Sequence, residues 1–196
     1  MEFAVSVWIS GLVEKMADYE QAYWVGRGSM EPKHYLQVVS WSEFFRPDTV
    51  LDYGCGTGEY VHSWLDLGVE AYGYDVSKHA VSNSYGQAGG RCYNSLVELP
   101  LSRYDLVTCY DVLEHLTEAQ VDETLRAIAG LATKDVLFSI CMAGDANFER
   151  DSTHILCRSR NWWKAKLSEY FDVCDAPPGF LFAHQLIIGR ARGVKW

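Results

Sequence analysis

Three glycines on alternate positions follow an acidic residue in the stretch TVLDYGCGTG at positions 49–58. The stretch opens with a β-branched, apolar run that suits a buried strand, and Asp52 stands near the end of that run. Gly54, Gly56 and Gly58 then lead into the apolar spacing of a helix. Glycines at such a turn leave bare backbone against which a small ligand can lie, where side chains would block it. The pattern predicts ligand binding between a strand and the helix that follows it.

The nearest alternative is the dinucleotide fingerprint Gly-x-Gly-x-x-Gly. Gly58 comes one residue too early for that fingerprint, and the tight turn would leave less room for a pyrophosphate. Asp52 also stands where a cationic amine is easier to place than a phosphate. A glycine turn without any ligand is the remaining alternative.

A second carboxylate, Asp75, ends the strand-like run 69–75. It follows Gly58 by about the length of one helix and one strand. A carboxylate at this place can accept hydrogen bonds from both hydroxyls of a ribose. Its alternative role is to cap a helix that starts near Ser77.

Two further segments carry a family pattern. The run 111–116 reads DVLEHL, and the turn at 52–58 reads D-x-G-x-G-x-G. With Asp75, these segments resemble the class I S-adenosylmethionine-dependent methyltransferases, and the resemblance covers about residues 46–196. It implies an α/β fold with a doubly wound seven-stranded sheet in the order 3-2-1-4-5-7-6, strand 7 being antiparallel, plus N-terminal helices. It also implies S-adenosylmethionine as cofactor and S-adenosylhomocysteine as product.

The resemblance assigns cofactor contacts to four places in the chain. Asn94 and Ser95 precede a Leu-Pro pair and stand where relatives pack on the adenine; many relatives carry Asp there, and an Asn can still accept through its amide oxygen. The backbone around Tyr110 and Asp111 would receive the methionine ammonium. The implied cofactor residues are Asp52, Gly54, Cys55, Gly56, Gly58, Asp75, Val76, Asn94, Ser95, Tyr110 and Asp111.

Asp151 and His154 are the candidate catalytic pair. A methyl acceptor loses a proton as it attacks, and a histidine held by a carboxylate is suited to take that proton. A similar Asp-x-Thr-His sequence occurs near the acceptor in part of the family. The alternative is that Asp151 or Ser152 caps the next helix while His154 packs beside it.

Glu114 and His115 also invite a catalytic interpretation, but the resemblance favours a role in ordering the loop and helix after them. The chain shows no cluster of residues with metal-ligand spacing, so no metal is expected.

The first 45 residues are expected to form a helical cap over a core at 46–196, the whole being one domain. Apolar residues at helical spacing predict a helix over about 2–24, and Pro32 suits the first turn of a second helix. N-terminal helices of the family help to enclose the substrate. Tyr23, Trp24 and Arg27 are therefore candidate substrate contacts, with ordinary packing as the alternative.

The remaining elements follow from periodicity and from turn residues. Thr117 with Gln120 forms a capping-box pattern at the start of a helix. Other helices are expected at 59–67, 77–85 and 162–170, and strands at 91–94, 104–111, 135–141, 171–174 and 181–188, the last two forming an antiparallel pair around a Pro-Pro-Gly turn.

Composition narrows the partners. The formal net charge of -9 repels nucleic acid and anionic membranes, since no dense basic run offsets it. The six cysteines are scattered without a Cys-x-x-Cys pair, which fits a reducing cytoplasm better than disulfides or zinc. The apolar run at 3–9 has no basic leader and is too short to span a bilayer. The oligomeric state is left open.

These features predict a methyltransferase that moves a methyl group to an oxygen or nitrogen of a small-molecule acceptor. The alternatives are a tRNA- or protein-modifying methyltransferase, a non-catalytic subunit that keeps the cofactor fold, and a different transferase such as an aminopropyl transferase. The presence of both carboxylates and all three glycines argues against the non-catalytic subunit.

Overall fold

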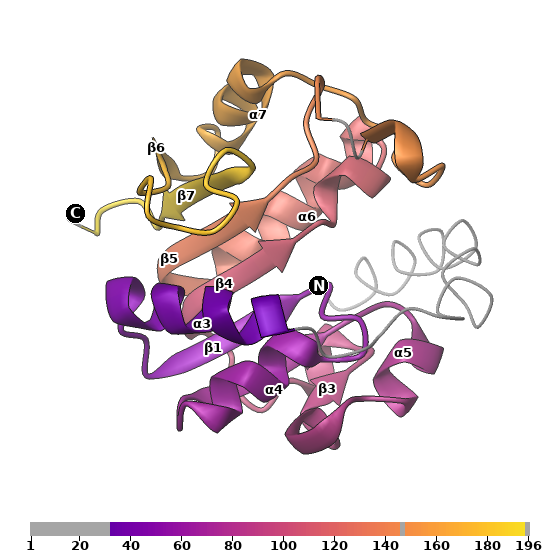
Figure 1. Ribbon diagram of the computed structural model, residues 1–196, viewed down its shortest axis with the longest axis vertical. Coiled ribbons are helices and arrows are strands. Elements are labelled where there is room, and N and C mark those ends of the chain that lie inside the picture. The colour runs from indigo at the N-terminus through magenta and orange to yellow at the C-terminus, as the bar shows by residue number, and fades with distance from the viewer. Residues whose placement is uncertain (1–31, 146–147, 195–196) are drawn as a thin grey trace, which may run out of the picture.

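The computed structural model describes residues 32–145 and 148–194 and shows a seven-stranded sheet (Figure 1). Its strand order is β3-β2-β1-β4-β5-β7-β6, and β7 runs antiparallel to both β5 and β6. The predicted order and the antiparallel seventh strand are therefore confirmed. The strands are β1 (Thr49–Tyr53), β2 (Glu70–Tyr74), β3 (Cys92–Tyr93), β4 (Tyr104–Tyr110), β5 (Ala132–Ser139), β6 (Asp172–Asp175) and β7 (Leu186–Arg190).

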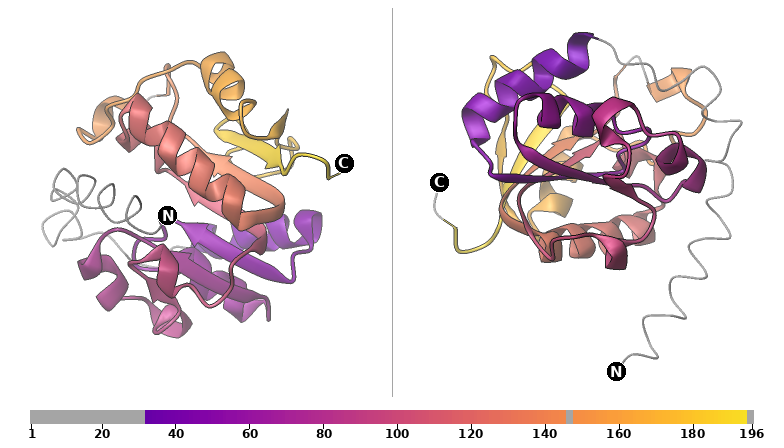
Figure 2. Two further views of the ribbon diagram at one scale, coloured as in Figure 1. Left: turned by 180° about the vertical axis from the view of Figure 1, so that it is seen from behind. Right: turned by 90° about the horizontal axis from the view of Figure 1, so that it is seen from below.

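Helices cover both faces of the sheet (Figure 2). The α-helices are α3 (Pro32–Phe45), α4 (Glu59–Asp66), α5 (Lys78–Ser82), α6 (Glu118–Leu131) and α7 (Arg160–Leu167), and short 3-10 turns lie at Gly86–Ala88, Leu96–Glu98, Leu113–His115 and Phe148–Arg150. Helices α3 and α4 pack on one face and α6 and α7 on the other. This is the layered arrangement of a doubly wound α/β fold.

The central strands are buried on both faces, which explains their continuous apolar sequence. Successive side chains alternate between two cores: Val50 packs with α3 and α4, whereas Leu51 packs with α6 and α7. Trp41 and Trp64 fill the first core, and Trp163 is buried in the second.

Two predicted helix starts are confirmed in detail. Pro32 is the first residue of α3. Thr117 caps α6 with a complete capping box in which Gln120 bonds back to the cap. Ser77 caps α5 by accepting from the N–H of Ala80, so the cap beside the second strand is Ser77 and not Asp75.

The seventh strand begins at Leu186 rather than at residue 181. Phe182 has a φ of 59°, and the N–H of Gln185 donates to its carbonyl at 2.9 Å. Such a turn cannot continue a ladder of strand bonds, so residues 181–185 form turns. The apolar run Leu181, Phe182 and Ala183 had predicted a strand, although Leu181 and Phe182 are exposed in the structure.

Helix α5 is shorter than predicted and ends at Ser82. The N–H of Tyr85 donates to the carbonyl of Thr57 at 2.7 Å, which draws the chain away from a helical path. Strand β5, in contrast, begins at Ala132, three residues before its predicted start. It begins there because Ala132 pairs with Tyr104 across a register shift.

The predicted helix at 2–24 and the candidate substrate contacts Tyr23, Trp24 and Arg27 lie outside the described residues. The single domain over 1–196 stays a prediction for the same reason. Over 32–145 and 148–194, no helix has the length and apolar character needed to cross a membrane.

A buried glutamine joins three elements near the end of β4. Gln37 of α3 is fully buried and donates to the hydroxyl of Tyr110 at 2.9 Å. The hydroxyl of Tyr60 donates in turn to the Gln37 amide oxygen at 2.9 Å. The rings of Tyr60 and Tyr110 lie 4.9 Å apart, and Trp41 packs against both. Hydrogen bonds and ring contacts thus fix α3 and α4 against the carboxyl end of β4.

We expect Gln37→Leu to lower the free energy of unfolding by about 1–3 kcal/mol, because two buried tyrosine hydroxyls each lose a partner. Chemical denaturation measures the change. Gln87→Leu, at an exposed glutamine, is the matched control and should shift the value by less than about 0.5 kcal/mol. A Gln37→Leu protein as stable as the wild type would show that these bonds do not hold α3.

Candidate functional site

The glycine turn after β1 has a backbone that only glycine adopts easily. Gly54, Gly56 and Gly58 have φ values of 83°, 54° and 80°. A side chain at Gly58 would place its Cβ 2.7 Å from the Cβ of Ala88, and one at Gly54 would collide with Val112. The turn is therefore closely packed on its inner side, and backbone forms its surface.

The turn is fixed to the end of β2. The carbonyl of Tyr74 accepts from the N–H groups of Gly54 and Cys55 at 2.7 and 3.0 Å. Cys55 is buried, and its thiol points toward Gly73 and the thiol of Cys92. Only the backbone of Cys55 can therefore face a ligand.

Asp75 bridges the two strand ends. Its Oδ2 accepts from the N–H of Gly56 and its Oδ1 from the N–H of Ser77, both at 2.8 Å. Burial raises the pKa of this carboxyl, and the two backbone bonds oppose the rise. Each oxygen keeps a lone pair beyond these bonds, as a ribose diol would need.

Asp52 is a buried acid near the end of β1. The hydroxyl of Thr108 donates to its Oδ1 at 2.6 Å, and only 2% of the residue is exposed. Burial raises the pKa of Asp52 to about 7, with the charges of Glu59 and Asp75 adding to the rise and the Thr108 bond opposing it. A cation bound nearby would be stabilised by this carboxylate.

The predicted adenine side lies at the same edge of the sheet. Val76 follows β2 and is 38% exposed, so it offers an apolar surface. Asn94 and Ser95 follow β3 and are half-buried. Because the carboxyl ends of parallel strands share one edge, these residues and the glycine turn border the same region.

Strand β4 ends in a strained residue. Asp111 has a φ of 53°, which is uncommon for a residue other than glycine. Its N–H donates to the Ser139 carbonyl at 3.0 Å, and its Oδ1 accepts from the Ser139 hydroxyl at 2.7 Å. These bonds to β5 hold the backbone of Tyr110 and Asp111 in an unusual conformation at the edge where ligands bind in such folds.

The structure places the candidate pair Asp151 and His154 in one loop, where the N–H of His154 donates to the carbonyl of Asp151 at 3.1 Å, but their side chains bond to different groups. Asp151 Oδ1 accepts from the hydroxyl and the N–H of Thr153, at 2.5 and 3.0 Å. His154 Nδ1 lies 3.2 Å from the carbonyl oxygen of Phe148. The Thr153 hydroxyl lies 3.0 Å from Nδ1 of His115, so a chain of bonds leads from Asp151 toward that histidine.

Glu114 anchors the loops around it, as expected. Its Oε1 accepts from the N–H of Cys141 at 2.7 Å, and its carbonyl accepts from the N–H groups of Ile155 and Leu156 at 2.9 and 3.0 Å. The residue is fully buried, and burial raises the pKa of its carboxyl to about 8.

A pocket of about 450 Å³ opens beside these loops. It is lined by Met142, Ala143, Gly144, Asp145, Arg160, His184 and Gln185. The loop after β5 and the turn before β7 form its walls.

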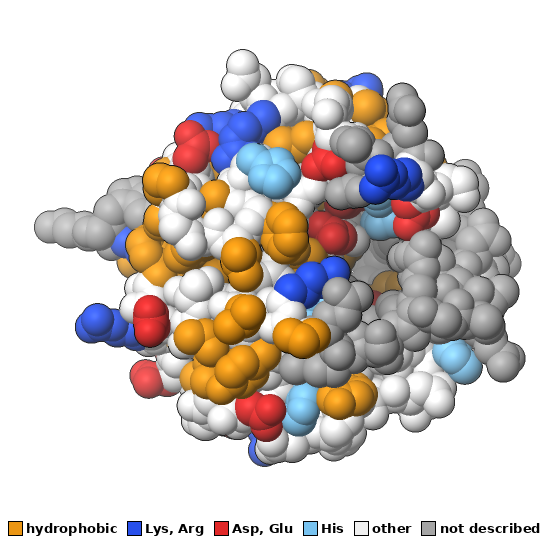
Figure 3. Space-filling view, viewed as in Figure 1, with side chains coloured by type: hydrophobic (Ala, Val, Ile, Leu, Met, Phe, Trp, Pro, Cys, Tyr) orange, Lys and Arg blue, Asp and Glu red, His pale blue; other side chains and the backbone are white. Residues whose placement is uncertain are grey.

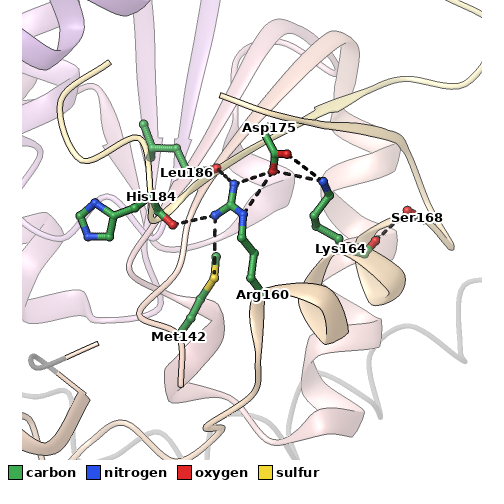
Figure 4. Close-up of polar contacts among 7 residues, drawn as sticks. All are labelled: Met142, Arg160, Lys164, Ser168, Asp175, His184 and Leu186. Atoms are coloured by element: carbon green, nitrogen blue, oxygen red, sulfur yellow. Dashed lines mark hydrogen bonds and ion pairs between the residues drawn. The ribbon is translucent and has the colours of Figure 1, made fainter. Parts of the chain in front are cut away.

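Arg160 fixes the shape of this pocket (Figure 4). Its guanidinium donates to the carbonyls of His184 and Leu186 at 2.6 and 2.7 Å and pairs with Asp175 at 2.8 Å. Lys164 pairs with the same carboxylate at 3.0 Å. The N-terminal end of α7 is thereby tied to β6 and to the turn that precedes β7.

Two contributors to the site were not predicted from the sequence. Gln37 and Tyr60 support the end of β4, and the only signal for Gln37 was a polar residue beside Val38 and Trp41 on the buried stripe of a helix. The sequence also did not reveal that Glu114 has a carboxylate oxygen without a hydrogen-bond partner among the described residues.

The strand order, the antiparallel seventh strand and the glycine turn after β1 define the class I methyltransferase fold. Residues 51–138 match a family model described as a methyltransferase domain. The chain therefore has the class I methyltransferase fold, and its residues 51–138 resemble a methyltransferase domain.

Particular relatives extend this comparison. The ubiquinone biosynthesis O-methyltransferase of Paraburkholderia xenovorans (strain LB400) is 29% identical over 131 residues, which cover 59% of this chain and 56% of that protein. The chain therefore spans about half the length of the curated relatives it matches.

Two solved structures share the fold. A SAM-dependent methyltransferase from Archaeoglobus fulgidus has a TM-score of 0.61 at 20% identity, over 84% of this chain and 95% of that one. Magnesium protoporphyrin IX methyltransferase from Synechocystis PCC 6803, solved with S-adenosylhomocysteine, has a TM-score of 0.59 at 19% identity, over 81% and 82%.

We expect the ligand-free protein to lose stability as the pH rises from about 4 to 7. The Asp52 carboxyl releases its proton near pH 7 when folded but near 3.8 when unfolded, so the folded state holds the extra proton in this window. At about 1.4 kcal/mol per pKa unit, the loss contributed by Asp52 is roughly 4 kcal/mol by pH 8.

Asp52→Asn keeps an acceptor for the Thr108 hydroxyl and removes this titration. The gain in Tm of Asp52→Asn over the wild type should therefore grow from pH 4 to pH 8. Asp48→Asn, at an exposed aspartate, is the control and should keep the wild-type slope. Parallel curves of Tm against pH for the wild type and Asp52→Asn would contradict the assignment.

Proposed function

We propose that the chain is an S-adenosylmethionine-dependent methyltransferase that methylates an oxygen or nitrogen of a small-molecule acceptor and releases S-adenosylhomocysteine. One observation carries the proposal: the Asp75 carboxylate is held by the N–H groups of Gly56 and Ser77. This arrangement puts a carboxylate that can accept hydrogen bonds from a diol beside a turn whose surface is backbone. The family match and the methyltransferase relatives support it.

The cofactor would lie along the carboxyl edge of the sheet. Its ribose hydroxyls would donate to Asp75, and its adenine would pack near Val76 and between Asn94 and Ser95. The methionine ammonium would lie near Asp52 and the strained backbone at Asp111, where the raised pKa of Asp52 indicates a carboxyl that a cation would stabilise.

The sulfonium methyl is already activated, so the work of the protein is mainly positioning. The acceptor atom forms a bond to the methyl carbon as the carbon–sulfur bond breaks, and the acceptor proton leaves to a base or to water. The aromatic cluster of Trp41, Tyr60 and Tyr110 rigidifies the wall of the site near the end of β4. A rigid wall keeps acceptor, methyl carbon and sulfur in line.

Two properties of the chain and one relative support a small-molecule acceptor. The net charge of -9 opposes polyanionic substrates. The pocket of about 450 Å³ falls in the size range of small-ligand sites. The relative from Paraburkholderia is named for O-methylation in ubiquinone biosynthesis. The cytoplasmic location and the catalytic role of Asp151 and His154 stay predictions.

We expect Asp75→Asn to weaken S-adenosylhomocysteine binding at least tenfold, as measured by equilibrium dialysis. The amide lacks one of the two acceptor oxygens that face N–H groups and ribose hydroxyls. Asp172→Asn, at an exposed strand residue, is the control and should bind as the wild type does.

The 2′-deoxy analogue separates a ribose contact from a loosened turn. If Asp75 holds the diol, losing the hydroxyl should weaken binding to the wild type by about tenfold and change binding to Asp75→Asn much less. Equal losses in both proteins would mean that Asp75 shapes the turn without contacting ribose.

A further inference from the structure

Three side chains with metal-binding atoms lie close together near the carboxyl edge of the sheet. Glu114, His115 and His154 each offer one such atom, and these atoms lie within 4.8 Å of one another. Glu114 and His115 belong to the turn after β4, whereas His154 lies in the loop between β5 and α7. Two imidazoles with one carboxylate form the donor set of many zinc and iron sites.

Glu114 contributes a buried carboxylate oxygen to this cluster. The residue has no exposed surface, and its Oε1 is occupied by the N–H of Cys141. Its Oε2 is also buried and accepts no hydrogen bond from the residues that the structure describes. A buried carboxylate oxygen without a partner is costly, and coordination of a cation would remove that cost.

The hydrogen bonds of the two histidines select the tautomer that a metal needs. His154 Nδ1 faces the carbonyl of Phe148 at 3.2 Å, and His115 Nδ1 faces the carbonyl of Thr153 at 3.1 Å. A carbonyl only accepts, so each Nδ1 carries the hydrogen and each neutral ring has its lone pair on Nε2. Metal-binding histidines commonly donate their second N–H to a carbonyl in this way.

Asp151 supports this arrangement indirectly, through the Thr153 hydroxyl. The Thr153 hydroxyl donates to Asp151 at 2.5 Å and therefore has a lone pair for the N–H of His115, which lies 3.0 Å away. A carboxylate thus polarises a histidine through a hydroxyl, which raises the basicity of the ring as outer-shell carboxylates do in metal sites.

The local charge also favours a cation. The negatively charged side chains of Asp111 and Asp151 act electrostatically on Glu114. A divalent cation bound to Glu114 would also be attracted by these two carboxylates. In Figure 3, acidic, histidine and basic side chains lie close together at the upper right of the face shown.

We propose that Glu114, His115 and His154 bind a divalent transition-metal ion of the zinc type, through Oε2 of the glutamate and Nε2 of each histidine. Ligand atoms about 2.1 Å from a common ion lie within about 4 Å of one another, so the three side chains close by roughly 1 Å. Three protein ligands leave a coordination position open to water or to an oxygen of another molecule.

An acceptor hydroxyl bound at the open position would become more acidic. That consequence rests on the proposed function, whereas the metal site itself does not. It also changes the role of His154: its Nε2 lone pair would bind the ion instead of taking a proton.

The test is a titration of the chelator-treated full chain with Zn²⁺, followed by calorimetry, with Co²⁺ as a spectroscopic probe. We expect one equivalent to bind. Glu114→Gln and His154→Ala should each weaken it by more than the roughly 10–100-fold that loss of an outer-shell partner costs. His79→Ala, at a histidine of α5 far along the sheet, is the control and should bind as the wild type does.

Two outcomes would overturn the proposed metal site. The first is that the wild type binds no Zn²⁺. The second is that both variants bind Zn²⁺ as the wild type does, which would place the bound ion at surface histidines. Melting curves check folding, and His154 is only half-buried, so at least one variant should fold. Parallel titration with S-adenosylhomocysteine keeps the two proposals apart. Metal binding without cofactor binding would refute the methyltransferase proposal alone, and the reverse result would refute the metal site alone.

Discussion

The fold of this site depends on one carboxylate that joins two strand ends. Asp75 accepts from the N–H of Gly56 and from that of Ser77, so it connects the glycine turn after β1 to the start of α5. The Tyr74 carbonyl adds two more bonds to the same turn. A turn with three residues at positive φ would otherwise sample many conformations. These bonds hold it in one, with its backbone toward the carboxyl edge of the sheet.

Most of the fold could be predicted because its signals are local. A buried parallel strand is a continuous apolar run, and Thr117 with Gln120 defines a helix start within four residues. The end of the chain was predicted less well. Residues 181–183 are apolar although Leu181 and Phe182 are exposed, and periodicity cannot separate such a turn from a strand. The glycine turn and Asp75 were predictable because a ligand-binding backbone imposes a fixed spacing.

The acceptor side could not be predicted in the same way, because its groups meet only through tertiary structure. Glu114 and His154 are far apart in the chain, so no metal-ligand spacing is visible, and the absence of a metal was expected on that ground. The short Asp151–His154 motif suggested a direct pair. In the structure the His154 side chain faces a carbonyl, and Asp151 bonds to Thr153, whose hydroxyl lies beside His115, while the catalytic pair stays a prediction. Which atom a histidine presents is set by such partners, not by its neighbours in sequence.

Calorimetric titration of the full chain with S-adenosylmethionine, S-adenosylhomocysteine and NAD tests the central claim most directly. A turn that ends one residue early for a pyrophosphate, beside the buried acid Asp52, should bind a cationic cofactor and reject a dinucleotide. The account predicts one site for S-adenosylmethionine and for its product, and no binding of NAD. Binding of NAD without either adenosyl ligand would contradict it, and so would a chain that binds none of the three.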